Sequence, residues 1–325
     1  MEALTAFVLR SPRSTAQAVA LLAANPQARL IAGGTDLIPN LRHGLGAPDQ
    51  LIDLRLIDEL KHIERSAEAW YIGAGVTLQQ LATNASVASE LPVLSQAAAA
   101  IAGPSHRSVA TLGGNLCLDT RCVYYNQSEW WRQSNNYCLK HLGDTCHVAP
   151  QGSHCHAAWS GDLAPALIAL DASVDILGAT GLRNFPLANL YTDDGAKPLT
   201  LQAGELVSGV HIAAQAQGMR CGYRKARVRG AVDFPLAGVA VRVILAQGVL
   251  TELRVTLTGT NSRPFLLEGT AALCNTPVTP VLLSALGKLV QKQVSPMRTT
   301  VTGANYRRQV ASVMAQGLVR ELGNP

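Results

Sequence analysis

The stretch Ile31-Ala32-Gly33-Gly34-Thr35-Asp36-Leu37 limits the possible fold classes more than any other, because it places paired glycines between two regular elements. The apolar run 29–32 precedes it as a predicted strand, and a predicted helix follows it. Glycine leaves room for a diphosphate and adopts the positive φ angles that point successive amides at one anion. The dipole at the start of the helix adds to that attraction. By itself, however, a glycine pair after a strand more often marks only a tight turn.

A second glycine turn, Thr111-Leu112-Gly113-Gly114-Asn115, follows the first at a distance of 80 residues, counted from Gly33 to Gly113. Two such turns could hold one extended dinucleotide from two sides. Neither turn matches the G-x-G-x-x-G pattern, and the chain contains no Walker P-loop. A doubly wound NAD-binding domain is therefore disfavoured.

The segments around these turns predict two α/β units that together span residues 1–214. In the first unit, about 1–55, Ser14 and Thr15 can cap a helix that Asn25-Pro26 then ends. Its predicted elements are a helix at 16–24 and strands at 29–32 and 50–54. The second unit, about 56–214, has predicted strands at 69–75 and 173–177 and predicted helices at 92–103 and 161–170.

From about residue 220 the pattern changes, and residues 213–219 are the expected domain boundary. The β-rich runs of this part are 220–229, 234–246 and 249–258, and its helical patterns are 263–274, 280–293 and 304–321. Strands grouped first and helices grouped afterwards predict an antiparallel sheet with helices on one face. The fold class is therefore α+β. A two-part α/β domain, 1–214, precedes a domain at 215–325 with a three-stranded antiparallel sheet and a helix bundle.

Composition limits the possible functions. Hydrophobic residues make up 48% of the 325 residues and charged residues 15%, so the chain has ample material for two cores. A formal net charge of +5 does not by itself indicate nucleic acid. No apolar run is long enough for a membrane span, and no secretory leader is expected. Seven cysteines, five of them between 117 and 155, indicate a reducing, cytoplasmic protein with a local metal site.

Four ordered motifs carry a family resemblance. They are AGGTDL at 32–37, TLGGN at 111–115, DLAPAL at 162–167, and the spaced set Tyr223, Lys225, Arg229 and Asp233. Together they resemble the FAD-binding medium subunit of the xanthine dehydrogenase and carbon monoxide dehydrogenase family, the molybdenum hydroxylases. The resemblance covers nearly the whole chain, including the α+β tail.

The resemblance implies how FAD would be bound. The two glycine turns would contact its diphosphate from opposite sides, and Asp162 would bind a hydroxyl on the flavin side. Lys225 would lie near the isoalloxazine, where a cation could stabilise the anionic reduced flavin; the alternative for Lys225 is a solvated charge on an edge strand. The residues expected to bind the cofactor are Ala32, Gly33, Gly34, Thr35, Asp36, Thr111, Gly113, Gly114, Asn115, Asp162 and Lys225. No catalytic residue is expected in this subunit.

Residues 117–160 form an insertion relative to the family pattern, in which the counterparts of Asn115 and Asp162 lie much closer together. Cys117 fits the family scaffold, which leaves Cys122, Cys138, Cys146 and Cys155, spaced C-x15-C-x7-C-x8-C. Four thiolates in one loop suit a 4Fe–4S cluster or a structural zinc ion. The spacing does not identify the metal, but an electron-transfer context favours the cluster.

The other side chains of the insertion each have a structural and a functional interpretation. Its histidines are expected to be hydrogen-bonding loop residues rather than ligands: His141, His147, His154 and His156. Its aromatic residues are expected to form a small apolar core that shields the metal, with a docking patch as the alternative: Tyr124, Tyr125, Trp130, Trp131 and Tyr137.

Within the family, a medium subunit with such an insertion resembles the 4-hydroxybenzoyl-CoA reductases. This resemblance implies that electrons from an acidic ferredoxin pass through a 4Fe–4S cluster and FAD to a 2Fe–2S small subunit and a molybdopterin large subunit, for reductive dehydroxylation in a dimer of heterotrimers. A basic face would help to recruit the ferredoxin. The chain also contains a run of five cations, about half of which are expected to be solvated charges and for which nucleic-acid binding is disfavoured: Arg220, Arg224, Lys225, Arg227 and Arg229. One alternative is an oxidative hydroxylase subunit that passes electrons outward and holds zinc, and another is an interaction module without flavin.

Overall fold

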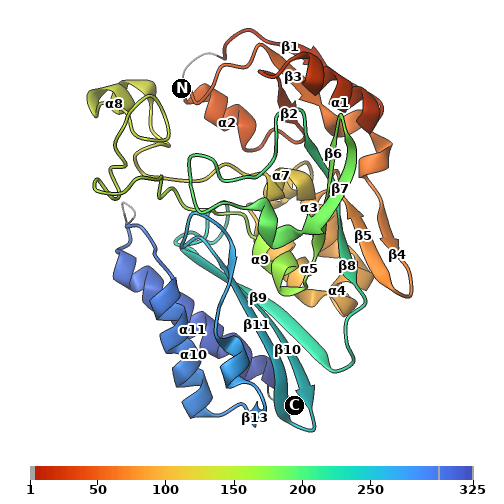
Figure 1. Ribbon diagram of the computed structural model, residues 1–325, viewed down its shortest axis with the longest axis vertical. Coiled ribbons are helices and arrows are strands. Elements are labelled where there is room, and N and C mark those ends of the chain that lie inside the picture. The colour runs from red at the N-terminus through yellow and green to blue at the C-terminus, as the bar shows by residue number, and fades with distance from the viewer. Residues whose placement is uncertain (1–3, 299–300, 324–325) are drawn as a thin grey trace.

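The computed structural model describes residues 4–298 and 301–323, whose strands form three sheets (Figure 1). The first sheet is parallel, with the order β1 (Val8–Arg10), β3 (Gln50–Asp53) and β2 (Arg29–Ile31). Helix α1 (Thr15–Ala24) packs on it and begins, as predicted, at Ser14, whose hydroxyl accepts a hydrogen bond from the Gln17 amide. The glycine turn then leads from β2 directly into α2 (Leu37–Arg42), at the carboxyl edge of the sheet.

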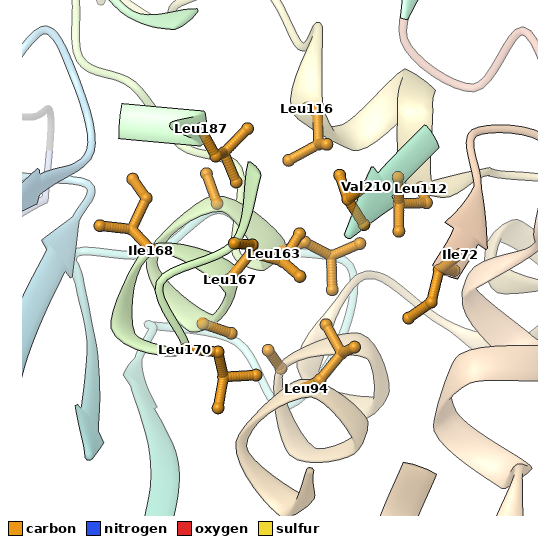
Figure 2. Close-up of a cluster of buried hydrophobic side chains, with 14 of the residues drawn as sticks. Ile72, Leu94, Leu112, Leu116, Leu163, Leu167, Ile168, Leu170, Leu187 and Val210 are labelled. Atoms are coloured by element: carbon orange, nitrogen blue, oxygen red, sulfur yellow. The ribbon is translucent and has the colours of Figure 1, made fainter. Parts of the chain in front are cut away.

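The second sheet is antiparallel and gives the molecule its largest core. Its strand order is β4 (Ile63–Arg65), β5 (Ala69–Gly73), β8 (Leu206–Ala213), β6 (Ser173–Gly178) and β7 (Gly181–Pro186). The chain between β5 and β6 contains α3 (Leu78–Thr83), α4 (Ala85–Glu90), α5 (Pro92–Ala100), α6 (Pro104–Arg107), α7 (Leu112–Leu116), α8 (Glu129–Ser134) and α9 (Leu163–Ala169). Figure 2 shows side chains from β5, β8, α5, α7 and α9 meeting in one apolar cluster.

Helix α9 is the centre of this arrangement. All seven of its residues, LAPALIA, are buried, as expected for a helix that is apolar on every side. One side of it packs against α5, and another packs against the third sheet. The DLAPAL motif thereby fixes Asp162, at the start of α9, between the two parts of the chain, namely the part that forms the first two sheets and the part that forms the third.

The third sheet is built on three long antiparallel strands, as predicted: β9 (Met219–Ala226), β10 (Ala237–Ala246) and β11 (Val249–Thr258). Alternate residues of β10 face different cores, because side chains along a strand point to opposite faces. Val239 and Val241 pack with α10 (Pro280–Gln293) and α11 (Ala304–Gly323), whereas Ala240 joins the core around α9.

The prediction of a helix at 263–274 is wrong. Within the described residues this segment forms β12 (Phe265–Leu266), which pairs with β11, and a 3-10 turn at Thr270–Leu273. Gly269 has a φ of 82°, which a helix interior does not accept. With β13 (Thr276–Pro277) also paired to β11, the sheet has five strands and carries two helices instead of the predicted three.

The cysteine-rich insertion leaves this framework through a narrow neck. Arg121 and Ala158 exchange two backbone hydrogen bonds of 2.8 Å, so the segment between them closes on itself. The insertion is mostly irregular, as predicted, but it contains the short helix α8, capped by Ser128. Figure 1 shows α8 near α2 and away from the sheets. No helix in the described part of the chain is long and apolar enough to cross a membrane.

Candidate functional site

The two glycine turns lie against each other. A Cβ atom added to Gly33 would overlap the carbonyl group of Val109, so only glycine permits this approach. Val109 precedes Thr111 by two residues, which brings the start of the second turn beside the first. Gly34 has a φ of 69°, a left-handed conformation that glycine adopts without strain. The structure thus joins two segments that were expected to hold one dinucleotide, and direct contact with FAD stays a prediction.

Replacing Gly33 by alanine should separate the two turns. Because the new methyl group would meet a backbone carbonyl that cannot rotate away, we expect a loss of about 1–3 kcal/mol in stability and a lower FAD content. Gly230→Ala is the matched control, since its Cβ would meet nothing within 4 Å. Thermal unfolding and the flavin absorbance of both purified variants measure the effect. Equal FAD content in the two variants would contradict the prediction.

Residues of the second turn are held by specific contacts. The Thr111 hydroxyl accepts a hydrogen bond of 3.1 Å from the Gly114 amide and so caps α7. A Cβ on Gly113 would lie 2.8 Å from that of Ala74, so close packing also requires this glycine. The Asn115 side chain accepts a hydrogen bond of 3.0 Å from the Leu163 amide. The Asn115 contact joins the turn to α9, while Gly114 itself remains exposed.

A buried ion pair lies between the two parts of the chain. Lys225 Nζ is 2.9 Å from Asp162 Oδ2, and both side chains are only 4% exposed. The Tyr223 hydroxyl donates to the other carboxylate oxygen, Oδ1, at 2.5 Å. Burial raises the pKa of Asp162 above its ordinary value, and Lys225 and Tyr223 oppose that rise. The alternative interpretation of Lys225, a solvated charge on an edge strand, is wrong: β9 lies at the sheet edge, but this side chain points inward.

Asp36 connects the first glycine turn to the neck of the insertion. Its carboxylate forms an ion pair with Arg121, and its other oxygen accepts from Asn40 Nδ2 at 3.2 Å. Arg121 also lies over the ring of Phe234, 4.6 Å from its centroid. Burial lowers the pKa of Arg121 to about 10, which leaves it charged at neutral pH. The neck of the insertion is therefore bound to the predicted diphosphate site.

The four cysteines of the insertion line one small cavity, part of it open to solvent. The residues that line it are Cys122, Tyr124, Tyr125, Cys138, Leu139, Lys140, Cys146, His147, Val148 and Cys155. No carboxylate is among them, so thiols are the dominant donors. Burial raises the pKa of the Cys155 thiol to about 12 and also raises that of Cys122. Metal binding must therefore displace protons from these thiols.

Not every residue predicted around the metal lies there. His147 is the one histidine among the lining residues, and its Nε2 lies 2.5 Å from the Tyr137 carbonyl oxygen. Tyr125 is buried against the cavity, whereas Trp130 is 73% exposed and cannot shield it. The apolar-core prediction is wrong for Trp130, because α8 turns this side chain outward.

The cations of the run at 220–229 largely make contacts within the chain. Lys225 is buried, Arg224 pairs with Glu321, and Arg227 donates to the Ala100 carbonyl. Arg229 pairs with Asp233 but keeps 67% of its side chain exposed.

Two buried cations of the insertion were not expected from the sequence. Arg132 is 1% exposed and donates to the carbonyl oxygen of His43 at 2.7 Å, which attaches the insertion to the end of α2. Lys140 is 5% exposed and lines the cysteine cavity. Their only sequence signal is the presence of cations among apolar and cysteine residues, which does not by itself predict burial.

Two glycine turns in contact, with a buried ion pair between the two parts of the chain, fit the expectation of a site for an extended dinucleotide. Comparison with known proteins identifies the family. Residues 5–214 match the family model described as the FAD binding domain in molybdopterin dehydrogenase, and residues 222–322 match the CO dehydrogenase flavoprotein C-terminal domain. The chain therefore belongs to the FAD-binding medium-subunit family of the molybdenum hydroxylases.

Individual relatives agree with this assignment. The chain is 31% identical over 282 residues to the aldehyde oxidoreductase FAD-binding subunit PaoB of Escherichia coli (strain K12), covering 82% of this chain and 85% of the relative. It is 28% identical to the carbon monoxide dehydrogenase medium chain of Hydrogenophaga pseudoflava, covering 81% and 78%. The names of these two relatives mention no iron–sulfur cluster.

The fold also matches solved structures. Reconstituted CO dehydrogenase from Oligotropha carboxidovorans superposes with a TM-score of 0.82 over 99% of both chains, at 24% identity. Quinoline 2-oxidoreductase from Pseudomonas putida 86 superposes with a TM-score of 0.79 over 99% of this chain and 98% of that one, at 22% identity. The α+β fold with its two-part α/β domain is thus confirmed.

Proposed function

We propose that this FAD subunit also holds a 4Fe–4S cluster, through Cys122, Cys138, Cys146 and Cys155, and transfers electrons between that cluster and FAD. One observation carries the proposal: cysteines spread over 34 positions of sequence line a single cavity. Their neighbours include apolar and aromatic side chains, which suit a shielded redox centre. When bound, the cluster supplies one-electron transfer and FAD supplies exchange between one- and two-electron carriers.

The electron-transfer role of a flavin subunit favours a cluster over a single zinc ion, because a redox centre extends the electron path and a structural zinc ion does not. Zinc binds sulfur at about 2.3 Å, which brings the sulfurs of a tetrahedral site to within about 3.8 Å of one another. In residues 4–298 and 301–323, no three His, Cys, Asp or Glu side chains are arranged to hold one metal ion, so the cysteine side chains must rearrange to bind either zinc or a cluster.

The reaction proposed for the whole enzyme is a reductive dehydroxylation like that of 4-hydroxybenzoyl-CoA reductase. An added low-potential centre beside the flavin is useful when electrons must enter from a strong reductant, such as an acidic ferredoxin. The partners would then be a 2Fe–2S small subunit and a molybdopterin large subunit, in a dimer of heterotrimers. This chain would contribute electron transfer and assembly, and the substrate site would lie on the large subunit.

The relatives favour a second candidate over the reductase. Their names describe an aldehyde oxidoreductase, a xanthine dehydrogenase and carbon monoxide dehydrogenases. If this chain works in the same direction, FAD receives electrons from the partner subunits and passes them outward. The cysteines would then hold a structural zinc ion.

Metal analysis of the anaerobically purified holoenzyme separates these candidates. The cluster proposal expects four iron and four sulfide ions per chain beyond those of the small subunit, and an additional EPR signal after reduction with dithionite. One zinc per chain and no additional sulfide would refute the cluster and leave the oxidative candidate. A chain without flavin absorbance would contradict both candidates.

A further inference from the structure

Lys140 stands out among the residues that line the cysteine cavity, because it is the one Lys or Arg among them. Its side chain is 5% exposed. The ammonium lies 4.2 Å from the centroid of the Tyr125 ring, which also lines the cavity. A cation placed this deeply is rare unless it is paired or has a function.

Three contacts hold the Lys140 ammonium in place. Nζ is 2.6 Å from Asp119 Oδ1, 3.2 Å from the Thr120 carbonyl oxygen and 2.5 Å from the Thr120 hydroxyl. That hydroxyl in turn donates to the Gly195 carbonyl at 2.6 Å. All three N–H bonds of the ammonium are therefore used, which fixes its orientation. Asp119 is the only carboxylate among these partners, and 29% of its side chain is exposed.

A fixed charge beside a redox centre shifts its reduction potential. A cluster held by four thiolates is negatively charged, and one-electron reduction adds a further negative charge. In a poorly solvated cavity, a nearby cation stabilises the more negative, reduced state more strongly than the oxidised state. A carboxylate beside that cation has the opposite effect, reduced here by its partial exposure to solvent.

We infer that Lys140 is a positioning and tuning residue that raises the reduction potential of the cluster bound by the four cysteines, and that Asp119 limits the increase. The inference rests on the proposed function, since it requires a cluster in the cavity. Electrons from a low-potential one-electron donor protein would then reduce this centre more completely than they would reduce the same cluster without Lys140.

The arrangement around Asp119 makes the two charges separable by mutation. The Asp119 backbone amide donates to Asp36 Oδ2 at 3.4 Å, and this link to the first glycine turn does not use the carboxylate. Asp119→Asn therefore removes one negative charge and leaves the backbone contact in place. Lys140→Met removes the positive charge and keeps an unbranched side chain of similar length. Lys140→Arg keeps the charge.

The test is an EPR-monitored redox titration of the cluster in the holoenzyme, with iron and sulfide measured in each variant. At the wild-type midpoint potential, Lys140→Met should lower the ratio of reduced to oxidised cluster about tenfold, a shift of about 59 mV for one electron. Asp119→Asn should shift the midpoint upward, and Lys140→Arg should stay near the wild type. A purely structural role for Lys140 would not produce shifts of opposite sign.

The possible failures are distinguishable. If the wild-type chain holds no cluster iron or sulfide, the proposed function fails. If all variants hold the cluster and Lys140→Met titrates at the wild-type potential, the role of Lys140 is refuted. Should Lys140→Met fail to load the cluster, Asp119→Asn decides: an upward shift supports the inference, and an unchanged midpoint overturns it.

Discussion

Lys225→Met is expected to destabilise the folded chain by about 3–5 kcal/mol and to lower its FAD content sharply. The substitution leaves the Asp162 carboxylate buried without its cation, since that side chain is only 4% exposed. The Ala100 carbonyl, which also accepts from Lys225, keeps a hydrogen bond of 3.0 Å from Arg227. The loss would therefore come mainly from the unpaired charge. Chemical denaturation and flavin absorbance measure the two effects.

The pH dependence of this variant gives an independent check. Burial already raises the pKa of Asp162, and removing Lys225 takes away the main opposing interaction. A carboxyl whose pKa is raised on folding favours the folded state at low pH and loses that contribution as pH rises through the folded pKa. The stability difference between Lys225→Met and the wild type should therefore be larger at neutral pH than near pH 4.

Two further variants serve as controls. Arg224 is the neighbouring residue on β9, and its ion pair with Glu321 is exposed, so Arg224→Met should cost less than about 1 kcal/mol. Adding Asp162→Asn to Lys225→Met removes the unpaired charge and should restore part of the stability. If Lys225→Met is no less stable than Arg224→Met, the buried pair does not have the role described for it.

Much of the framework could be predicted because it depends on local signals. Helix α1 begins at a capping serine and ends before a proline, and α10 begins with Pro280 and spans the predicted range 280–293. The long strands β9, β10 and β11 follow from their β-rich composition. The helix at 263–274 could not be distinguished in this way, because its apolar spacing also fits a strand and a turn. Pairing with β11, a tertiary contact, decides that segment.

The candidate site was predictable in its parts and not in its connections. The glycine turns were identifiable, but the contact between Gly33 and the Val109 carbonyl joins segments that lie far apart in sequence. Likewise, the burial of Lys225 depends on Asp162, 63 residues earlier, and that of Arg132 on the carbonyl of His43, 89 residues earlier. Long cationic side chains are exposed in most proteins, so composition alone predicts the opposite of what the fold requires here.

Cys138→Ser should abolish the 4Fe–4S cluster and leave FAD bound. Cys138 lines the cavity and is 8% exposed. A serine hydroxyl ionises far less readily than a thiol and is a poor ligand for iron in such a cluster. The additional iron, sulfide and EPR signal should therefore disappear. This loss is the largest change expected at this site.

Retention of FAD in Cys138→Ser follows from how the insertion is attached. The backbone hydrogen bonds between Arg121 and Ala158 close its neck without the metal, and the Arg121–Asp36 ion pair holds that neck against the first glycine turn. The control is Cys274→Ser, in the third-sheet domain and outside the cavity, which should keep both cofactors. Loss of FAD together with the cluster would show that the metal organises the flavin site. Because the flavin turns are held by their own contacts, we expect the two cofactors to be lost separately.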